Sequence, residues 1–361
     1  MLSPKVLSNI LKWCFNATIK SKPFPLICNI WITNKCNFRC KFCYQDFNIA
    51  SKTLSEDKFK MAVDDLEGMG TIYLYISGGE PLLVDKIEER IEYAAKKIPY
   101  VHMVSNGFLL NEEKAQKLAK TGISEISVSL DGMEATHTKY RENEKAFSNA
   151  IMAINNLKNY APNIKITCSS MVAPWNIDDQ MELMKLCDSL NVEQRLTAFE
   201  DFPVVKENYI DDFEITDEFL EKLKVFLKCY SELHKDRFLK FIEIFFESKI
   251  NDNTSSEFEL FNDPCLVPSF YVNILEDGSV SPCHGVHKYH NYQKEIFNIN
   301  NHTLKEIIFS KEYKRLIQEM RTCSYCRELL SSCYIRPRLV FPPASFFKYT
   351  VYPRIRDIFG F

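Results

Sequence analysis

Three cysteines, Cys36, Cys40 and Cys43, follow one another with the spacing C-x3-C-x2-C. This spacing places three thiolates on one tight loop and supplies no fourth thiolate. A cubane iron–sulfur cluster takes four ligands, so a cluster held by three cysteines leaves one iron free to bind a group that is not protein. The loop therefore predicts a [4Fe–4S] cluster with one iron open for chemistry.

A structural zinc site, or a set of buried thiols, is the alternative interpretation of the same loop. Zinc sites usually pair C-x2-C with a second pair of ligands nearby. No cysteine or histidine lies between Cys43 and His102. The second half of a zinc site is therefore missing from this region, and a cluster is the favoured interpretation.

A second candidate motif is the turn Gly78-Gly79-Glu80-Pro81, which comes 35 residues after the last cysteine of the loop. Two glycines let a backbone approach a ligand closely, and the neighbouring carboxylate can accept hydrogen bonds from an ammonium group. A plain strand-to-helix turn is the alternative. The turn follows a β-rich run at the next expected strand end, and this position makes the motif specific.

Together, the cysteine loop and the glycine turn resemble the radical S-adenosylmethionine (SAM) enzymes, whose signature has an aromatic residue, here Phe42, before the last cysteine. In that family the open iron is chelated by the amino and carboxylate groups of SAM. One electron then cleaves SAM to a 5′-deoxyadenosyl radical, which abstracts a hydrogen atom from the substrate. The resemblance implies that Cys36, Cys40 and Cys43 are the catalytic cluster ligands. It also implies that Gly78, Gly79, Glu80 and Pro81 hold the amino group of SAM.

The elements that must position these motifs alternate between strands and helices. Strands are expected at 26–32, 73–77, 101–104, 125–128, 164–171 and 192–199, and helices between them at 55–67, 83–97, 111–121, 145–159 and 177–189. Such alternation indicates a parallel β/α architecture. Six units match the partial (β/α)6 TIM-like barrel of the radical SAM family, so the predicted fold class is α/β.

Polar residues stand where the third and fourth strands end, which is where barrels of this kind gather ligand-binding groups. By the resemblance, Ser105, Asn106, Ser129 and Asp131 face the ribose or methionine part of SAM. Arg141, ten residues after Asp131, is placed like the arginine that pairs with the SAM carboxylate. Ordinary turn chemistry is the alternative for Ser105, Asn106 and Ser129, and a solvated surface position is the alternative for Arg141.

Five of the thirteen cysteines lie in the carboxyl-terminal part of the chain: Cys265, Cys283, Cys323, Cys326 and Cys333. Two short strands joined by Asp277-Gly278 predict a hairpin that presents Cys283 at its end. This segment resembles the SPASM and shorter twitch extensions of the family, which bind auxiliary [4Fe–4S] clusters. A full SPASM domain has seven cysteines, so five favour one auxiliary cluster, held by Cys265, Cys283, Cys323 and Cys326. Cys333 is a spare thiol or a replacement ligand.

Three histidines, His284, His287 and His290, follow Cys283 at three-residue intervals. They could bind a metal or act as acid and base near the auxiliary cluster, and an exposed loop without function is the alternative. Sulfatase-maturing members of the family have an aspartate after the equivalent cysteine. The histidine at position 284 counts against that activity. The cysteines without ligand spacing are expected to pack in the core: Cys14, Cys28, Cys168, Cys187 and Cys229.

We expect five segments: a helical extension at 1–25, the barrel at 26–235, a helical linker at 236–260, the cluster domain at 261–338 and an aromatic, basic tail at 339–361. A chain of 361 residues accommodates a barrel and one smaller domain. The net charge of −3 gives no reason to expect nucleic acid as a partner. Thirteen cysteines in ligand-like clusters fit a reducing cytoplasm, and we predict neither a signal peptide nor a membrane span. The tail either packs on the barrel or contacts a membrane surface.

The resemblance implies radical modification of a peptide or protein side chain, because members with such a cluster domain are mostly peptide maturases. Oxidation or rearrangement of a small molecule, such as a sugar alcohol, cofactor precursor or lipid, is the first alternative. A non-enzymatic iron–sulfur electron carrier is the second alternative. It is disfavoured because carriers usually saturate their cluster with four cysteines. An electron donor such as flavodoxin or ferredoxin is the expected protein partner.

Overall fold

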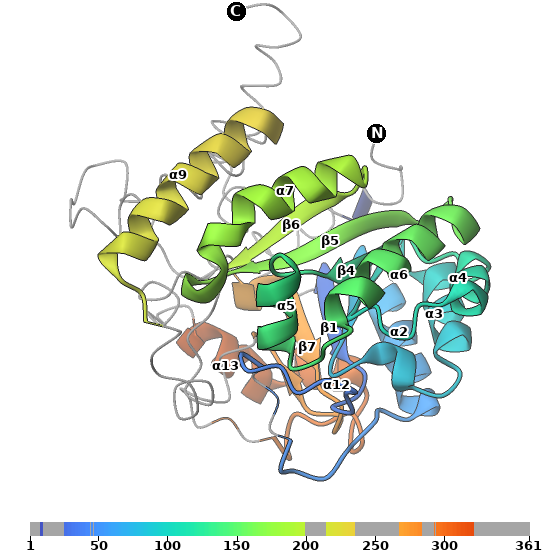
Figure 1. Ribbon diagram of the computed structural model, residues 1–361. Helices are drawn as coiled ribbons and strands as arrows, with labels where there is room; N and C mark the ends of the chain where they lie inside the picture. Colours follow the sequence, from blue (N-terminus) through green and yellow to red (C-terminus); the bar gives the residue numbers. More distant parts are fainter. Residues whose placement is uncertain are drawn as a thin grey trace, which may run out of the picture.

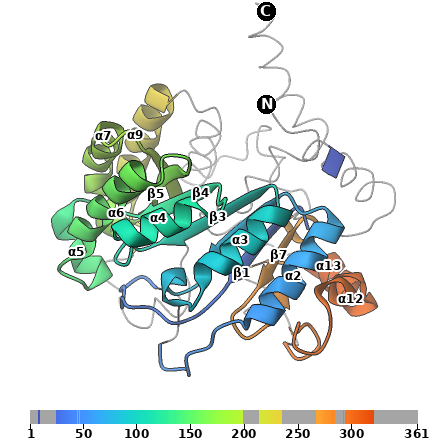
Figure 2. The ribbon, with the colours of Figure 1, turned by 90° about the vertical axis from the view of Figure 1, so that its right-hand side faces the viewer.

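The computed structural model describes residues 8–9, 25–43, 45, 47–198, 214–234, 267–283, 292 and 294–320. Their strands form one sheet in the order β6-β5-β4-β3-β2-β1-β7-β8, with helices packed along its outer face (Figure 1 and Figure 2). The strands are β1 (Ile27–Trp31), β2 (Tyr73–Ser77), β3 (Tyr100–Ser105), β4 (Glu125–Ser129), β5 (Lys165–Val172), β6 (Glu193–Ala198), β7 (Tyr271–Ile274) and β8 (Val280–Ser281).

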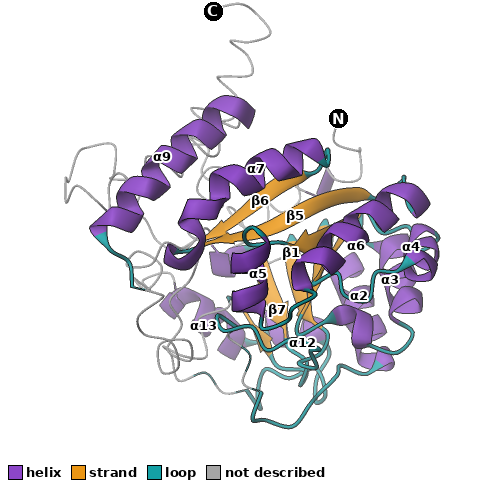
Figure 3. Cartoon of the chain, in the orientation of Figure 1, coloured by secondary structure: helices purple, strands orange, loops and turns teal. Residues whose placement is uncertain are grey.

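The helices follow the strands in alternation through the barrel, as Figure 3 shows. They are α2 (Glu56–Met69), α3 (Ile87–Lys97), α4 (Glu112–Ala119), α5 (Glu134–Arg141), α6 (Ala146–Tyr160), α7 (Gln180–Ser189), α9 (Asp217–His234), α12 (Leu304–Phe309) and α13 (Lys311–Met320). Short 3-10 turns occur at η1 (Pro81–Leu83), η2 (Pro174–Asp179) and η5 (Val267–Ser269).

Strands β1 to β6 are all parallel, and each pairs with the next strand along the chain. All six expected strands occur within two residues of their predicted limits. Sequential parallel strands joined by helices are the defining feature of a β/α barrel. The predicted α/β class and the partial-barrel architecture are therefore confirmed.

The two faces of the sheet differ in chemistry. One cross-strand row, formed by Ile30, Ile76, Met103 and Ile126, is fully buried in the core that also takes in the helices. The neighbouring row on the opposite face holds Asn29, Tyr75, His102 and Glu125. Parallel sheets with both faces covered usually have apolar residues throughout. The concave face of this sheet is polar, which suits an interior that receives a polar ligand.

Three helices of the barrel differ from expectation for local reasons, and α12 and α13, which follow β8, were not predicted either. Helix α3 begins at Ile87, not at 83, because η1 occupies Pro81–Leu83 and is capped by the side chain of Glu80. Helix α7 begins at Gln180 because η2 occupies the preceding residues. Helix α5 was not predicted, since its sequence is mostly polar and buries only His137 and Tyr140.

The hairpin predicted around Asp277-Gly278 is present as β7 and β8, which pair antiparallel. Strand β7 also pairs with β1 in parallel, with Cys28 opposite Val272 and Ile30 opposite Ile274. One sheet therefore runs from the barrel into the region expected to bind the auxiliary cluster (Figure 1). The limits of the five expected segments remain predictions.

Several expectations fall on residues that the structure does not describe. They include most of the helical extension at 1–25, the linker at 236–260 and the tail at 339–361. Among the helices that are described, none combines the length and apolar character that crossing a membrane requires.

Candidate functional site

The residues predicted to hold the SAM-binding cluster and SAM lie where the carboxyl ends of β1 to β5 meet. Cys36, Cys40 and Cys43 lie on the loop after β1, and the glycine turn follows β2. Each cysteine sulfur accepts a hydrogen bond from a nitrogen: from Phe38 N at 3.4 Å, Arg141 Nη1 at 3.9 Å and Gln45 N at 3.4 Å, respectively. Among the described residues, no three cysteine, histidine or carboxylate side chains converge tightly enough to hold a single metal ion.

Burial raises the pKa of all three thiols. The pKa of Cys40 rises to about 12 and that of Cys43 to about 11, although Arg141 opposes both shifts. The pKa of Cys36 is also raised by burial. Without a metal the three groups are therefore neutral thiols at pH 7, and iron binding must displace their protons.

An aromatic stack holds the cysteine loop against η2 and α5. The ring of Trp175, in η2, stacks on Phe42 at 5.1 Å and on Tyr140 at 4.2 Å between centroids. The Arg141 guanidinium lies 5.1 Å from the centre of the Phe42 ring, and Lys41 N donates to Tyr140 O at 2.9 Å. The loop is thus attached to both α5 and the end of β5.

The two glycines of the turn are required by the chain that leads into the cysteine loop. A Cβ atom on Gly78 would lie 2.3 Å from Thr33 O, and one on Gly79 would lie 2.1 Å from Lys35 O. Gly79 N donates to Thr33 O at 2.6 Å, and Glu80 N donates to Lys35 O at 2.7 Å. We expected the glycines to leave room for a ligand. The structure shows that the backbone of residues 33–35 occupies the space beside them, and this contact holds the turn next to the cysteine loop.

Glu80 is 1% exposed and accepts three hydrogen bonds. Its Oε1 accepts from Leu82 N at 3.1 Å and from Ser105 Oγ at 2.9 Å, and its Oε2 accepts from Asn106 N at 2.8 Å. Burial raises the pKa of Glu80, while these donors oppose that rise. Ser105 and Asn106 therefore hold the carboxylate in place, and the Asn106 side chain donates to Asn37 Oδ1 of the cysteine loop at 2.7 Å.

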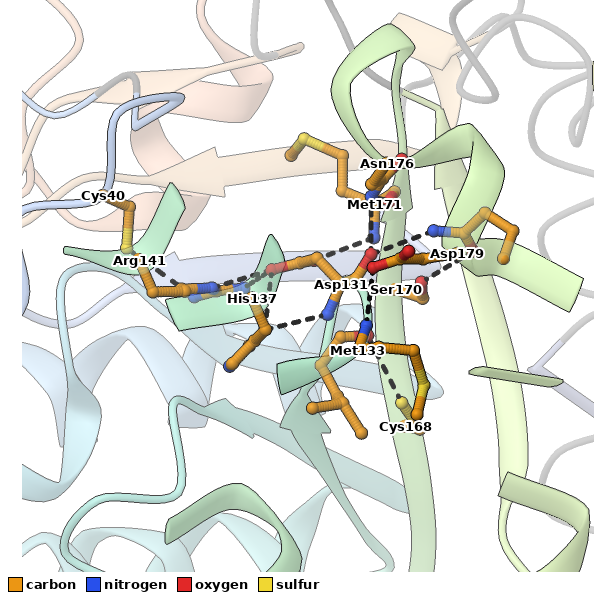
Figure 4. A network of polar contacts seen from close by, with 12 residues as sticks. Cys40, Asp131, Met133, His137, Arg141, Cys168, Ser170, Met171, Asn176 and Asp179 are labelled. Carbon is orange, nitrogen blue, oxygen red and sulfur yellow. Dashed lines mark hydrogen bonds and ion pairs between the residues drawn. The ribbon is translucent and has the colours of Figure 1, made fainter. Parts of the chain in front are cut away.

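The buried Asp131 and the partly buried Arg141 form an ion pair just beyond the end of β4 (Figure 4). Arg141 Nε and Nη2 lie 2.7 Å and 2.6 Å from Asp131 Oδ2. Asp131 Oδ1 accepts from Met171 N at 3.0 Å, and Asp131 N donates to His137 Nδ1 at 3.1 Å. Burial alone would lower the pKa of Arg141, but Asp131 and the neighbouring thiols raise it, so the guanidinium is permanently charged. Arg141 is thus largely shielded from solvent and contacts both Asp131 and Cys40, so the structure does not favour the alternative of a solvated surface arginine.

Ser129 ends β4 two residues after Ser127, and side chains two apart share a face of a strand. Ser127 Oγ lies 2.7 Å from His102 Nε2 on the concave side of the sheet. Ser129 therefore faces the same interior, 9% exposed.

Several site residues escaped the sequence analysis. The carbonyl of Asp131 accepts from Asn176 Nδ2 at 2.6 Å and from Gln180 Nε2 at 2.9 Å, and Asp179 Oδ2 accepts from Met133 N at 2.8 Å. Asn176 and Gln180 are buried polar residues of η2 and α7. A polar stretch directly after β5 was the signal that could have indicated them.

Of the residues expected to bind the auxiliary cluster, the structure describes Cys283, which lies two residues after the end of β8 and is half-buried. The others lie outside the described residues, as do the three histidines: Cys265, Cys323, Cys326, Cys333, His284, His287 and His290. Cys28, Cys168 and Cys187 are buried in the core, as expected, Cys229 is half-buried, and Cys14 is not described.

Two family models match this chain. Residues 30–187 match the radical SAM superfamily, and residues 265–333 match SPASM, an iron–sulfur cluster-binding domain. The chain therefore carries a radical SAM domain, followed by a SPASM domain, as the resemblance of its motifs implied. Both domains imply iron–sulfur clusters, the cofactor class that the cysteine spacing predicts.

Curated relatives include enzymes with different substrates. Fe-coproporphyrin III synthase of Methanosarcina barkeri (strain Fusaro / DSM 804) is 32% identical over 154 residues, which are 42% of this chain and 38% of the relative. Sporulation killing factor maturation protein SkfB of Bacillus subtilis (strain 168) is 26% identical over 164 residues, which are 45% of this chain and 40% of the relative. The chain thus matches about two fifths of the length of each.

Among solved structures, SuiB of Streptococcus suis, bound to its precursor peptide SuiA, has a similar fold. The TM-score is 0.66 at 16% identity, and the superposition covers 91% of this chain and 75% of that chain. At this identity the likeness concerns the fold alone. It extends the similarity beyond the radical SAM domain to most of the chain.

Proposed function

We propose that this protein reductively cleaves SAM and uses the resulting 5′-deoxyadenosyl radical to abstract a hydrogen atom from a substrate. The observation on which the proposal rests is that three groups of residues lie together at one edge of the sheet. These are the three-cysteine loop, the buried Glu80 carboxylate and the Asp131–Arg141 pair. Both matched domains support it.

The residues of the loop fit a [4Fe–4S] cluster, because each sulfur already receives one N–H hydrogen bond. Such bonds stabilise the charge on cluster sulfurs. In this proposal Cys36, Cys40 and Cys43 hold the cluster, which supplies one electron to the SAM sulfonium when bound. Trp175 and Arg141 keep the Phe42 ring, and with it the loop, at a fixed position.

Glu80 and Arg141 then bind opposite charges of the methionine part of SAM. A carboxylate offers about four acceptor positions, and three are occupied in Glu80, so Oε2 can accept a further hydrogen bond from the SAM ammonium. Arg141 uses Nε and Nη2 on Asp131 and directs Nη1 toward Cys40. The remaining guanidinium hydrogens suit the SAM carboxylate, since arginine presents five donors in a fixed plane. Ser129 and Asn106 are proposed to contact the ribose or methionine part.

We propose that the substrate is a peptide or protein side chain. SkfB is a maturation protein, and SuiB was solved with a precursor peptide, although each shares only part of its sequence with this chain. A tetrapyrrole is the second candidate, because Fe-coproporphyrin III synthase is 32% identical over the matched region. The auxiliary cluster, with Cys265, Cys283, Cys323 and Cys326 as ligands, would accept the electron released when the substrate radical is oxidised.

The two substrate classes are separated by adding each to the reconstituted enzyme with SAM and dithionite. A porphyrin-type precursor of Fe-coproporphyrin III should leave the rate of 5′-deoxyadenosine formation unchanged, whereas a precursor peptide encoded beside this gene should raise it. A deuterated peptide should also transfer deuterium to 5′-deoxyadenosine. Stimulation by the porphyrin alone would replace the peptide proposal with the second candidate.

The auxiliary ligands are tested by Cys326→Ala, with Cys40→Ala as the matched variant at the other cluster. Cys326→Ala should keep SAM binding and block product formation, whereas Cys40→Ala should abolish SAM cleavage. Flavodoxin or ferredoxin should replace dithionite as the electron donor. A membrane contact of the tail is tested separately: deletion of 339–361 with unchanged partition to vesicles would remove it.

A further inference from the structure

The loop between β1 and α2 carries a charge opposite to that of the rest of the chain. Residues 33–52 hold four cations and one carboxylate, a net charge of +3, whereas the whole chain carries −3 and the remaining residues therefore carry −6. Lys35, Arg39 and Lys52 are exposed to solvent. A local excess of positive charge on an exposed segment attracts partners of the opposite sign and raises their rate of association.

Arg39 is held in place by the loop itself. It lies between two of the cysteines, and its Nη1 donates to Cys36 O and to Phe38 O, each at 2.9 Å. Its guanidinium lies 4.3 Å from the centre of the Phe47 ring. Within the described residues, neither Arg39 nor Lys35 forms an ion pair with a carboxylate. The positive charge of these side chains is therefore available to a partner.

Exposed apolar side chains lie beside these cations. The Phe108 ring packs edge-to-face on Phe38 of the loop, with 5.8 Å between the ring centroids. Leu83 lies in η1, directly after the glycine turn that contacts residues 33–35, and Ile49 belongs to the loop. Phe108, Leu83 and Ile49 are all large apolar residues with exposed side chains. Aromatic and apolar side chains beside an arginine are typical of a surface that binds another protein.

Six residues therefore make up one surface, called the loop face below: Lys35, Arg39, Ile49, Lys52, Leu83 and Phe108. The loop face lies next to the thiols that the proposed function assigns to the SAM-binding cluster, because the Arg39 guanidinium contacts the Cys36 carbonyl. A protein bound there contacts the cluster loop directly. Each reductive cleavage of SAM consumes one electron at this cluster, and the rate of electron transfer falls steeply with distance.

We propose that the loop face is the docking site of the electron donor, and that this donor is a small acidic redox protein. The inference rests on the proposed function, because it takes the three-cysteine loop as the site of the SAM-binding cluster. In the docked complex the donor is oxidised by one electron and the cluster is reduced by one electron, while no covalent bond forms or breaks. Carboxylates of the donor pair with the three cations, and its apolar residues cover Phe108 and Leu83.

The test uses an acidic flavodoxin as the probe and the double variant Lys35→Glu with Lys52→Glu in the full-length, reconstituted protein. The double variant should bind flavodoxin about tenfold more weakly than the parent, because opposite charges at the interface become like charges. Titration with flavodoxin at low and at physiological ionic strength measures the affinity. Added salt should weaken binding to the parent more than to the variant, since salt screens exposed charges. Parental affinity in the double variant overturns the proposal.

A matched double variant, Lys120→Glu with Lys185→Glu, makes the same change of net charge at exposed lysines of the end of α4 and of α7. It should bind flavodoxin like the parent, and an equal loss of affinity there overturns the proposal. Dithionite is a small ion that needs no docking surface, so parent and both double variants should form 5′-deoxyadenosine at similar rates with it. With flavodoxin as the donor, only the variant at the loop face should be slowed.

Arg39→Gln decides the outcome if the double variant at the loop face retains less iron than the parent. Glutamine removes the charge without reversing it, so Arg39→Gln should still weaken flavodoxin binding and its salt dependence. Parental affinity in Arg39→Gln contradicts the docking site.

Dithionite also separates this inference from the function on which it rests. A loaded parent chain that does not cleave SAM with dithionite contradicts the proposed function, whereas cleavage with dithionite but no binding of flavodoxin contradicts the docking site alone. Vesicles that contain phosphatidylserine test a lipid surface as the occupant. Vesicle binding that the loop-face variant loses, together with parental affinity for flavodoxin, assigns the loop face to a membrane and overturns the proposal.

Discussion

The buried carboxylate of Glu80 accepts three hydrogen bonds from protein donors. Its three partners come from η1 and from the end of β3, so the orientation of the carboxylate depends on two neighbouring strand ends. The charge of Glu80 also reaches Cys36, where it raises the pKa of the thiol. A single buried carboxylate thus links the glycine turn, the third strand and the cysteine loop.

Glu80→Gln should weaken SAM binding at least tenfold without removing iron from the loop. Glutamine keeps the size of the side chain but loses the charge, and a hydrogen bond to a charged group contributes about 1.5–3 kcal/mol. Isothermal titration of SAM into the reconstituted protein measures the change. Glu88→Gln, which removes the ion pair with Lys114, is the matched control and should leave the SAM affinity unchanged. Equal affinity in Glu80→Gln and the parent would exclude Glu80 as the ammonium ligand.

Arg141→Ala should destabilise the metal-free chain by about 3 kcal/mol, because it leaves the Asp131 carboxylate buried without its cation. Chemical denaturation gives this free energy directly. Lys222→Ala breaks an exposed pair with Asp178, which water and salt screen, and should change stability far less than Arg141→Ala. An equally small effect of Arg141→Ala would contradict this prediction, because it would show that other groups stabilise the charge of the Asp131 carboxylate.

At the scale of elements, the glycine turn and the cysteine loop depend on each other. The backbone of residues 33–35 occupies the space that a Cβ atom on Gly78 or Gly79 would need. The turn therefore positions the loop segment 33–35, which leads into the three cysteines, in addition to any role in binding SAM.

Gly79→Ala should lower both stability and iron content, since its Cβ atom would lie 2.1 Å from Lys35 O. Gly68→Ala is the matched control: nothing lies within 4 Å of the new atom, and the residue is inside α2. That control should be more stable by about 0.5–1 kcal/mol. The measurements are denaturation of the metal-free chain and iron per chain after reconstitution. Normal iron content in Gly79→Ala would contradict the proposed coupling.

The strands were predictable because each is an apolar run followed by turn residues, as in 73–77 before Gly78-Gly79. Helix α5 was not predictable in this way, since tertiary contacts and not an apolar stripe hold it. The parallel pairing of β7 with β1 joins residues about 240 positions apart, and no local pattern specifies such a partner.

The candidate site was predictable in its residue types but not in its contacts. The spacing of the cysteines and the sequence Gly78-Gly79-Glu80 indicate chemistry by themselves. The contacts depend on how separate strand ends meet in the fold. Ser105 and the Asn106 backbone donate hydrogen bonds to Glu80, and the Asn176 side chain donates one to the Asp131 carbonyl. Turn chemistry and ligand binding were both open for Ser105, and the structure shows its hydroxyl bonded to Glu80.

At the scale of the whole molecule, the polar interior of the barrel places buried histidines among charged groups. Burial, with help from Arg195 and Lys165, lowers the pKa of His102 to about 3. Tyr73 OH lies 2.5 Å from His102 Nδ1, and Glu125 Oε1 lies 3.6 Å from Nε2. Burial and the neighbouring Arg141 lower the pKa of His137 to about 4.

The metal-free chain should lose stability as the pH falls below about 6.5. In that range His102 and His137 bind protons in the unfolded chain but stay neutral in the folded one, because their folded pKa values are lower. Each histidine contributes a slope of about 1.4 kcal/mol per pH unit until its folded pKa is reached. Stability from these groups is therefore fully present above pH 6.5 and declines toward pH 4. Denaturation of His102→Gln between pH 4 and 7 should show a shallower slope than the parent, and an identical slope would contradict the pKa shift.

The most direct test of the account is to reconstitute the full chain anaerobically, count iron and sulfide, and assay 5′-deoxyadenosine after adding SAM and dithionite. We predict about eight irons per chain, since two [4Fe–4S] clusters need that number, and SAM cleavage that Cys40→Ala abolishes. A fully loaded cluster loop that produces no 5′-deoxyadenosine, or equal cleavage by Cys40→Ala, would contradict radical SAM chemistry at this site.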